Sequence, residues 1–175
     1  ANGFLGVEGI HVYVLYPKGK VSEIQEKQFT TLGQNITALE VDGTFDDCQA
    51  LVKAAFMDKE LNEHLSLTSA NSINVARFLP QAFYYFYAYA QLKRAGKAAN
   101  AVICVPSGNF GNITAGLFGK KMGLPIKRFI AANNRNDIFY QYLQTGKYNP
   151  RPSIATIANA MDVGDPSNCL LYTSP

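Results

Sequence analysis

The sequence predicts an α/β fold, in which a parallel sheet carries helices on both faces in a Rossmann-like three-layer arrangement. Strand-like and helix-like segments alternate along most of the chain, and this order is typical of parallel strands joined by crossover helices. Two helix-like segments begin with the residue spacing of a capping box. Hydrophobic residues make up 47% of the 175 residues and charged residues 17%, which indicates a globular protein rather than a disordered chain.

The predicted elements follow one another with short connections. In chain order they are a strand over 10–17, a helix over 22–33, a strand over 35–43, a helix over 44–58, a long helix over 69–96, a strand over 101–105, a helix over 110–122, a strand over 126–133 and a helix over 136–146. The strand segments are rich in β-branched and aromatic residues. Ser22 with Gln25, and Thr44 with Asp47, have capping-box spacing. Pro80 is expected to kink the long helix or to open its second half.

Composition and charge argue against several classes of partner. The net charge is +3 and the basic residues are scattered, so a nucleic-acid partner is not expected. No apolar run reaches the roughly 20 residues that span a bilayer, so no membrane partner is expected either. Cys48, Cys104 and Cys169 lie far apart without metal-ligand spacing. We therefore expect reduced thiols in a cytoplasmic protein, no metal site, and Cys104 buried in its strand. A small molecule is the expected partner.

The first candidate site is the Gly-rich turn "PSGNFGN", which connects a predicted strand to a predicted helix. Ligands of parallel α/β sheets bind beyond the carboxyl ends of the strands, and a helix N-terminus suits an anion. Gly108 and Gly111 allow a close approach of the backbone, while Ser107, Asn109 and Asn112 add neutral donors. The turn holds no lysine and lacks GxGxxG spacing, so it is neither a Walker A loop nor a dinucleotide fingerprint. Such a turn favours a small phosphate, although an ordinary Gly-rich connection is equally compatible with it.

The second candidate site is the segment "SANSIN", which precedes Arg77. At 100° per residue, Asn71, Asn74 and Arg77 would spread over roughly 120° of one helical face. The Ser72 hydroxyl lies in the same segment, and arginine binds phosphate oxygens in a bidentate manner. We interpret the segment as a second anion site. The alternative is an N-cap followed by a solvated polar face.

Three long stretches resemble the threonine synthase family of pyridoxal 5′-phosphate (PLP) enzymes. They are "LTSANSINVARFLPQAFYYFYAYAQL", "VPSGNFGNITAGLFGKKMGLPIKRFIAANNRND" and "IATIANAMDVGDPSN", and the likeness extends to about Asn168. The resemblance implies part of the tryptophan-synthase-β-like (type II) PLP fold. It also implies the conversion of O-phosphohomoserine and water to threonine and phosphate.

The same resemblance assigns roles to both candidate sites. The cofactor phosphate would be held by Ser107, Gly108, Asn109, Phe110, Gly111 and Asn112. The substrate phosphate would be held by Asn71, Ser72 and Arg77. Residues 1–100 would form most of the smaller α/β domain with the helix that leads back to the large domain, and 101–168 would form part of the large cofactor-binding domain. The tail 169–175 departs from the family pattern, and we expect it to be non-native or truncated.

The resemblance also implies that the chain is an internal fragment of such an enzyme. In the family, the lysine that forms the Schiff base with PLP and the loop for the substrate carboxylate lie upstream of the matching region. The partner of the pyridine nitrogen lies downstream. The lysines in this chain do not stand in a matching motif; those considered are Lys18, Lys20, Lys53, Lys59, Lys93, Lys97, Lys120, Lys121 and Lys127. We expect no catalytic residue in the chain and no activity from it alone.

Three alternatives stay open at this point. The first is another type II PLP enzyme, such as a dehydratase or a β-replacement enzyme, although these reactions need no site for a phosphate leaving group. The second is a non-enzymatic α/β module that binds phosphate or nucleotide. The third is a remnant that assembles only with missing segments. The segments 133–137 and 159–163 match the family, and 133–137 could border the cofactor, but the sequence assigns no role to either.

Overall fold

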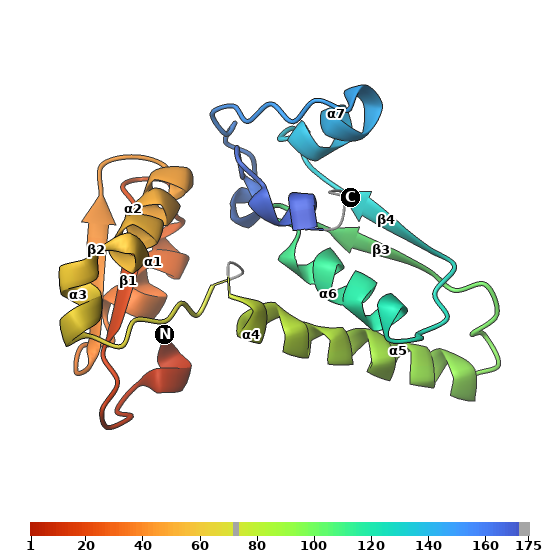
Figure 1. Cartoon of the computed structure of the whole chain (residues 1–175), viewed down its shortest axis with the longest axis horizontal. Helices are drawn as coiled ribbons and strands as arrows, with labels where there is room; N and C mark the ends of the chain where they lie inside the picture. Colours follow the sequence, from red (N-terminus) through yellow and green to blue (C-terminus); the bar gives the residue numbers. More distant parts are fainter. Residues whose placement is uncertain (72–73, 172–175) are drawn as a thin grey trace. The chain divides into compact units, whose positions relative to one another are not determined.

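The computed structural model describes residues 1–71 and 74–171 of the chain. The chain divides into two compact units, Ala1–Leu67 and Thr68–Pro175 (Figure 1). Each unit contains one sheet of two parallel strands, and helices follow the strands along the chain. The predicted α/β class and the parallel pairing are therefore confirmed. In the sequence, the boundary between the units falls just before the long predicted helix, whereas the predicted domain boundary follows that helix. The predicted division stays a prediction.

The first unit is built on the strand pair β1 and β2. Its elements are the 3-10 turn η1 (Asn2–Phe4), β1 (Val12–Pro17), α1 (Glu23–Thr30), β2 (Ile36–Val41), α2 (Phe45–Met57) and α3 (Lys59–His64). Val12 lies opposite Ile36, and this register continues to the ends of both strands.

Side-chain caps set the helix starts of the first unit. Both predicted capping boxes are present, because Ser22 accepts from the backbone N–H of Gln25 and Thr44 from that of Asp47. Helix α3 is absent from the prediction. It begins after Asp58, whose carboxylate accepts from the backbone N–H of Leu61. Its sequence, "KELNEH", has too few apolar residues to show a helical period.

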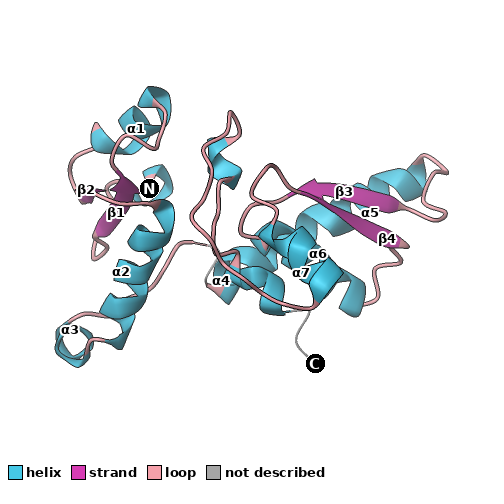
Figure 2. Cartoon of the chain, turned by 90° about the horizontal axis from the view of Figure 1, so that it is seen from above, coloured by secondary structure: helices cyan, strands magenta, loops and turns pink. Residues whose placement is uncertain are grey.

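The second unit is built on the strand pair β3 and β4, which lie side by side in Figure 2. Its elements are α4 (Val75–Phe78), the 3-10 turn η2 (Leu79–Gln81), α5 (Ala82–Arg94), β3 (Val102–Pro106), α6 (Gly111–Lys121), β4 (Arg128–Ala132), α7 (Ile138–Thr145) and the 3-10 turns η3 (Asn159–Met161) and η4 (Ser167–Leu171). Within the described ranges, no helix has both the length and the apolar composition that a bilayer crossing requires.

The predicted long helix is wrong in its first part and interrupted in its middle. Helix α4 begins only at Val75, because the Asn74 side chain accepts from the backbone N–H of Ala76 and caps it. An asparagine that bonds to the backbone in this way starts a helix rather than continuing one. Pro80 lies in the turn η2 between α4 and α5, as its expected kinking role implies.

Helix α6 lies between the sheet of the second unit and α5 (Figure 1). Gly116 permits this close packing, since a Cβ there would lie 2.8 Å from ring atoms of both Tyr85 and Phe129. Side chains alternate between the two faces of a strand. Val102 and Cys104 therefore share a face of β3, and both are exposed. The prediction that Cys104 is buried is wrong because the described residues leave this face of the sheet uncovered.

Candidate functional site

The Gly-rich turn occupies the carboxyl end of the second unit's sheet. Strand β3 ends at Pro106 and α6 begins at Gly111, as the prediction places them within one or two residues. The backbone N–H of Ser107 donates to the carbonyl of Ala132 on β4 at 2.8 Å. The turn thus starts from the last rung of the sheet, which is the edge where ligands of parallel α/β sheets bind.

The side chains of Ser107 and Asn112 hold the turn together. The Ser107 hydroxyl is buried and donates to Asn112 Oδ1 at 3.0 Å. Asn112 Nδ2 donates to the Pro106 carbonyl at 2.7 Å, and Asn112 Oδ1 accepts from the backbone N–H of Ile113 at 2.8 Å. These two side chains were expected to face a ligand. In the structure these two side chains serve the turn itself, so they leave the donation to a ligand to other groups of the turn, its backbone N–H groups among them.

Phe110 anchors the turn and changes the direction of the backbone. Its ring is buried and lies 4.5 Å, between centroids, from the ring of Phe139 on α7. Its φ angle of 62° is in the left-handed region, directly before the helical residues of α6. A left-handed residue adjoining helical ones can form a concave arrangement of backbone N–H groups that suits an anion.

The N-terminus of α6 is open. Its N-cap residue is Phe110, which makes no side-chain hydrogen bond to the helix. The turn contributes a series of backbone N–H groups that have no acceptor in the described part of the chain; they belong to Gly108, Phe110, Gly111 and Asn112. Unpaired N–H groups at the positive end of a helix dipole are the ordinary means by which proteins bind phosphate. The turn therefore fits a phosphate group by its donor set.

A neighbour that the sequence does not reveal closes the turn on one side. A Cβ on Gly108 would lie 2.8 Å from Cα of Met161 and 3.0 Å from its carbonyl oxygen. Only glycine fits at this contact without a shift of one backbone against the other. The contact explains why position 108 is glycine, and it brings the segment 159–163 to the candidate site.

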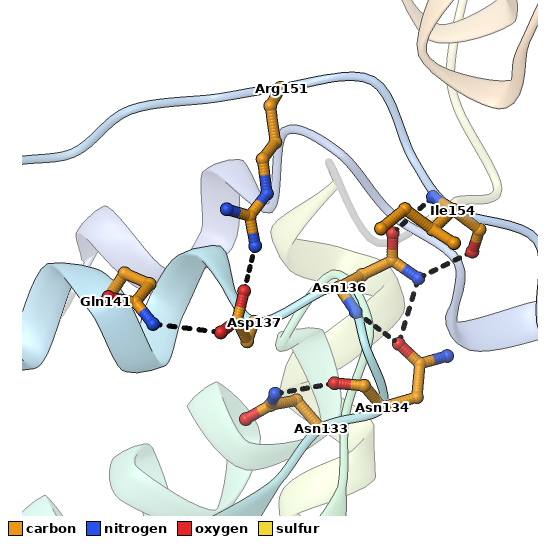
Figure 3. Close-up of polar contacts among 7 residues, drawn as sticks. All are labelled: Asn133, Asn134, Asn136, Asp137, Gln141, Arg151 and Ile154. Atoms are coloured by element: carbon orange, nitrogen blue, oxygen red, sulfur yellow. Dashed lines mark hydrogen bonds and ion pairs between the residues drawn. The ribbon is translucent and has the colours of Figure 1, made fainter.

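The segment 133–137 connects to the chain that follows α7 (Figure 3). Asn136 Nδ2 donates to Asn134 Oδ1 and to the Ile154 carbonyl, both at 2.9 Å, and Asn136 Oδ1 accepts from the Ile154 N–H at 2.7 Å. Asp137 accepts from Gln141 Nε2 at 3.0 Å and forms an ion pair with Arg151. The hydrogen bond from Gln141 and the charge of Arg151 lower the pKa of Asp137. These residues have internal structural partners, and their expected place at the cofactor border stays a prediction.

The second candidate site is a short loop tied to the start of α4. Arg77 is exposed, and its Nε donates to the Ala70 carbonyl at 3.1 Å, which folds the side chain back over the loop. Asn71 is exposed and accepts at its carbonyl from the backbone N–H of Asn74 at 3.0 Å. Ser72 lies outside the described residues. The predicted common helical face is wrong because the helix starts after Asn74.

Tyr85 of α5 supports the first turn of α6. Its hydroxyl donates to the carbonyl of Asn112 at 2.7 Å, and burial raises the pKa of Tyr85 to about 12. The phenol is therefore protonated and able to donate at any ordinary pH. Both candidate sites and this support belong to the second unit.

Known proteins resemble the chain over nearly its whole length. A family model described as "Pyridoxal-phosphate dependent enzyme" matches residues 5–172. Proteins named threonine synthase from Haemophilus influenzae and Escherichia coli are 55% and 53% identical to the chain over 168 residues. These alignments cover 96% of this chain and 39% of each relative. The chain thus spans about two fifths of the length of these curated relatives.

Solved structures show the same likeness. The crystal structure of threonine synthase from Escherichia coli matches with a TM-score of 0.90 at 51% identity, and covers 96% of this chain and 39% of that one. The structure of PLP-bound threonine synthase from Brucella melitensis matches with a TM-score of 0.77 at 43% identity, and covers 95% and 36%. The predicted partial type II PLP-enzyme fold is confirmed.

Proposed function

The chain belongs to the family of pyridoxal-phosphate-dependent enzymes, and we propose from this premise that it is the phosphate-holding segment of a threonine synthase. The open N-terminus of α6 is the observation that carries the proposal. Its unpaired backbone N–H groups would take the 5′-phosphate of PLP, while Ser107 and Asn112 hold the turn in shape. The reaction would convert O-phosphohomoserine and water to threonine and phosphate.

Two different phosphates explain why the chain offers two candidate anion sites. PLP, when bound, supplies an electron sink for the carbanion chemistry of the reaction. In the described part of the chain, the two Nη groups of Arg77 make no hydrogen bond, so its guanidinium can bind a phosphate while Nε stays on Ala70. With Asn71 and Ser72, Arg77 would orient the leaving phosphate of the substrate.

The second site also separates threonine synthase from other type II PLP enzymes. A dehydratase or a β-replacement enzyme that releases no phosphate has no use for the arginine at this position. A non-enzymatic phosphate or nucleotide module would use the α6 turn without any preference for PLP. The first alternative is tested at Arg77, and the second by competition between ligands.

We further propose that the Schiff-base lysine is not among the residues of this chain. Every lysine in the chain is exposed to solvent. A lysine that bonds to a cofactor is usually held in a desolvated environment that lowers its pKa. The chain alone would therefore bind the cofactor phosphate without catalysing the reaction.

The proposal is tested by ligand titration of the purified chain. The probe is 4′-deoxypyridoxine 5′-phosphate, which keeps the phosphate and ring of PLP but has no aldehyde to react with surface lysines. We expect saturable binding in calorimetry, and a loss of roughly 100-fold or more in the variant Gly108→Asp. This variant adds a carboxylate beside the open N–H groups and a Cβ that would lie 2.8 Å from Met161 Cα. The matched control is Gly3→Asp, since a Cβ on Gly3 would meet no atom within 4 Å.

Each part of the proposal has its own contrary outcome. Equal affinity in the chain and in Gly108→Asp would contradict the assignment of the α6 turn. Displacement of the probe by ATP at lower concentration than by PLP would favour the nucleotide module. A stoichiometric adduct on one lysine, seen by intact mass after PLP and borohydride, would contradict the absence of the Schiff-base residue. Arg77→Gln should weaken binding of O-phosphohomoserine and leave the probe unaffected.

A further inference from the structure

We infer that Asp162 is a positioning residue for the phosphate turn, which it fixes through the backbone of its neighbour Met161. The inference rests on the proposed function for the meaning of the turn. Residues 154–163 form a segment between α7 and the end of the chain, and part of that segment is the wall against which Gly108 packs. The hydrogen bonds that fix the backbone around Met161 therefore also restrict the movement of the turn at Gly108.

The Asp162 carboxylate is the centre of a hydrogen-bond network. Its Oδ1 accepts from Asn134 Nδ2 at 2.7 Å, from Thr156 Oγ1 at 2.7 Å and from Asn136 Nδ2 at 3.1 Å. Its Oδ2 accepts from the backbone N–H of Thr156 at 2.8 Å. Hydrogen bonds to a charged acceptor are roughly twice as strong as neutral ones. One carboxylate thus ties the end of β4, through both asparagines, to the segment 154–163.

The same network fixes the short turn that contains Met161. Thr156 Oγ1 accepts from the backbone N–H of Ala158 at 3.1 Å, and the carbonyl of Ala158 accepts from the N–H of Met161 at 2.8 Å. The carbonyl of Met161 accepts from the N–H of Val163 at 3.0 Å. The turn is therefore held before Met161 by Thr156 and after it by Asp162. The three atoms nearest to a Cβ on Gly108 all belong to the Met161 backbone, so we assign the positioning role to Asp162 rather than to the Met161 side chain.

The nearby residue Asp165 provides a matched control. It accepts from the Tyr148 hydroxyl at 2.5 Å, so a carboxylate hydrogen bond also joins the residues that flank the segment 154–163. It follows the turn that touches Gly108, and its partner Tyr148 precedes the segment 154–163 in the sequence. If any carboxylate hydrogen bond near this segment stabilised the phosphate turn, then removing the Asp165 carboxylate would loosen the turn as much as removing the Asp162 carboxylate.

The experiment compares Asp162→Asn with Asp165→Asn in two measurements. The first is hydrogen exchange of the peptide 107–112 without ligand, read at the backbone N–H of Ser107, which bonds to the Ala132 carbonyl at 2.8 Å. The second is the dissociation constant of 4′-deoxypyridoxine 5′-phosphate. In Asp162→Asn an amide N–H₂ replaces an acceptor and faces donors. We expect exchange in 107–112 to become roughly tenfold faster and the probe to bind roughly tenfold more weakly. Asp165→Asn should leave both unchanged.

A double variant tests the chemistry of the contact. Asn134→Asp combined with Asp162→Asn restores a donor and an acceptor between these two positions, and we expect it to recover part of the lost exchange protection and affinity. If Asp162→Asn unfolds the second unit, seen as lost protection in β3 and α5, then Thr156→Val decides the question. That variant removes one donor to Asp162 and the acceptor of the Ala158 N–H, keeps the Asp162 carboxylate, and should give the same effects at a smaller size.

The outcomes separate this inference from the proposed function. Unchanged exchange of 107–112 in Asp162→Asn would overturn the positioning role, whatever the ligand does. Equal acceleration in Asp162→Asn and Asp165→Asn would overturn it as well, because it would reduce both residues to general clamps. A chain that does not bind the probe, but whose turn is loosened only by Asp162→Asn, would contradict the proposed function and support the positioning role.

Discussion

Helices α2 and α6 both follow a parallel strand, yet their N-termini are completed in opposite ways. At α2 the Asp47 carboxylate accepts from the backbone N–H of Thr44 at 2.7 Å and from its hydroxyl at 2.8 Å, and the Thr44 hydroxyl accepts from the N–H of Asp47. The helix closes its own end with an anion from its own first turn. At α6 the side chains of Ser107 and Asn112 bond to the strand and to each other. The N–H groups of Gly111 and Asn112, the first two of α6, have no partner among the described residues, whereas that of Ile113 bonds to Asn112 Oδ1.

The difference shows that a binding turn can be recognised by the backbone N–H groups that its own side chains leave unpaired. Every helix start exposes N–H groups that some acceptor must satisfy. A start that is closed by a local carboxylate has no capacity for a ligand anion. A start that is braced by neighbours but left without a cap keeps that capacity, and the brace holds its shape while the site is empty. We therefore treat the α2 turn as a built-in comparison for the α6 turn.

The largest expected difference between the two turns comes from adding one methyl group to each. A Cβ on Gly43 would lie 2.8 Å from Asp47 Oδ2, the end of a side chain that can rotate. A Cβ on Gly108 would lie 2.8 Å from the Met161 backbone, which cannot move without its segment. We expect Gly108→Ala to lower the free energy of unfolding of the second unit by about 1–3 kcal/mol. Gly43→Ala should cost the first unit about 1 kcal/mol or less, through a weakened cap.

Hydrogen exchange in increasing urea resolves the two units and measures both effects in the same way. Gly108→Ala should also abolish binding of 4′-deoxypyridoxine 5′-phosphate, whereas Gly43→Ala should leave it unchanged. If the two variants lower stability equally, or if both still bind the probe, the proposed contrast between the turns is wrong.

Local signals in the sequence were sufficient to predict much of this comparison. Ser22 and Thr44 act within their own first turns, so their spacing alone predicts the caps that the structure contains. The position of the α6 turn follows from an apolar strand, two glycines and a helical period. Asn74 shows the limit of local signals. Its spacing indicates a place on a helical face, with an N-cap as the alternative, and in the structure its side chain caps the helix that starts at Val75.

The remainder depends on contacts between residues that lie far apart in the sequence. The contact of Met161 with Gly108 and the network around Asp162 join segments on either side of α7. No periodicity or spacing encodes such a pairing. The same holds for Ser107 and Asn112, since residue type alone does not tell whether a hydroxyl or an amide faces a ligand or its own backbone. The roles assigned to the two phosphate sites stay predictions.

Tyr85 sharpens the comparison, because the open turn receives its support from another helix. Its hydroxyl bonds to the Asn112 carbonyl in the first turn of α6. Tyr85→Phe removes this bond, and we expect the second unit to lose about 1 kcal/mol of stability and the probe to bind several-fold more weakly. The first unit, whose α2 turn is closed by its own residues, should be unaffected. Exchange rates of the α2 and α6 peptides measure this, and equal changes in both would contradict it.

The same tyrosine predicts a dependence on alkaline pH. Burial raises its pKa from 10.0 to about 12 in the folded chain. The unfolded chain therefore releases this proton first, and the stability that the neutral phenol contributes is complete below pH 10 and is lost as the pH rises from 10 toward 12. Absorbance at 295 nm should show a late tyrosine titration, and the Tyr85 part of it should be missing in Tyr85→Phe, while the pKa of Tyr16, which burial also raises, is unaffected.

The smallest expected effect is an acid dependence that belongs only to the closed turn. Hydrogen bonds from the Thr44 hydroxyl and backbone lower the pKa of Asp47 below its ordinary value of 3.8. The unfolded chain binds this proton at higher pH than the folded chain does. The contribution of the cap is thus present above pH 3.8 and is lost as the pH falls through the folded pKa. Carbon NMR of the Asp47 carboxyl should show the lowered pKa, and Thr44→Ala should move it back toward 3.8. The α6 turn has no carboxylate in this position, so exchange of the peptide 107–112 should show no matching change between pH 5 and 3. An acid-induced loosening of equal size in both turns would mean that the α6 turn is closed by an internal anion after all.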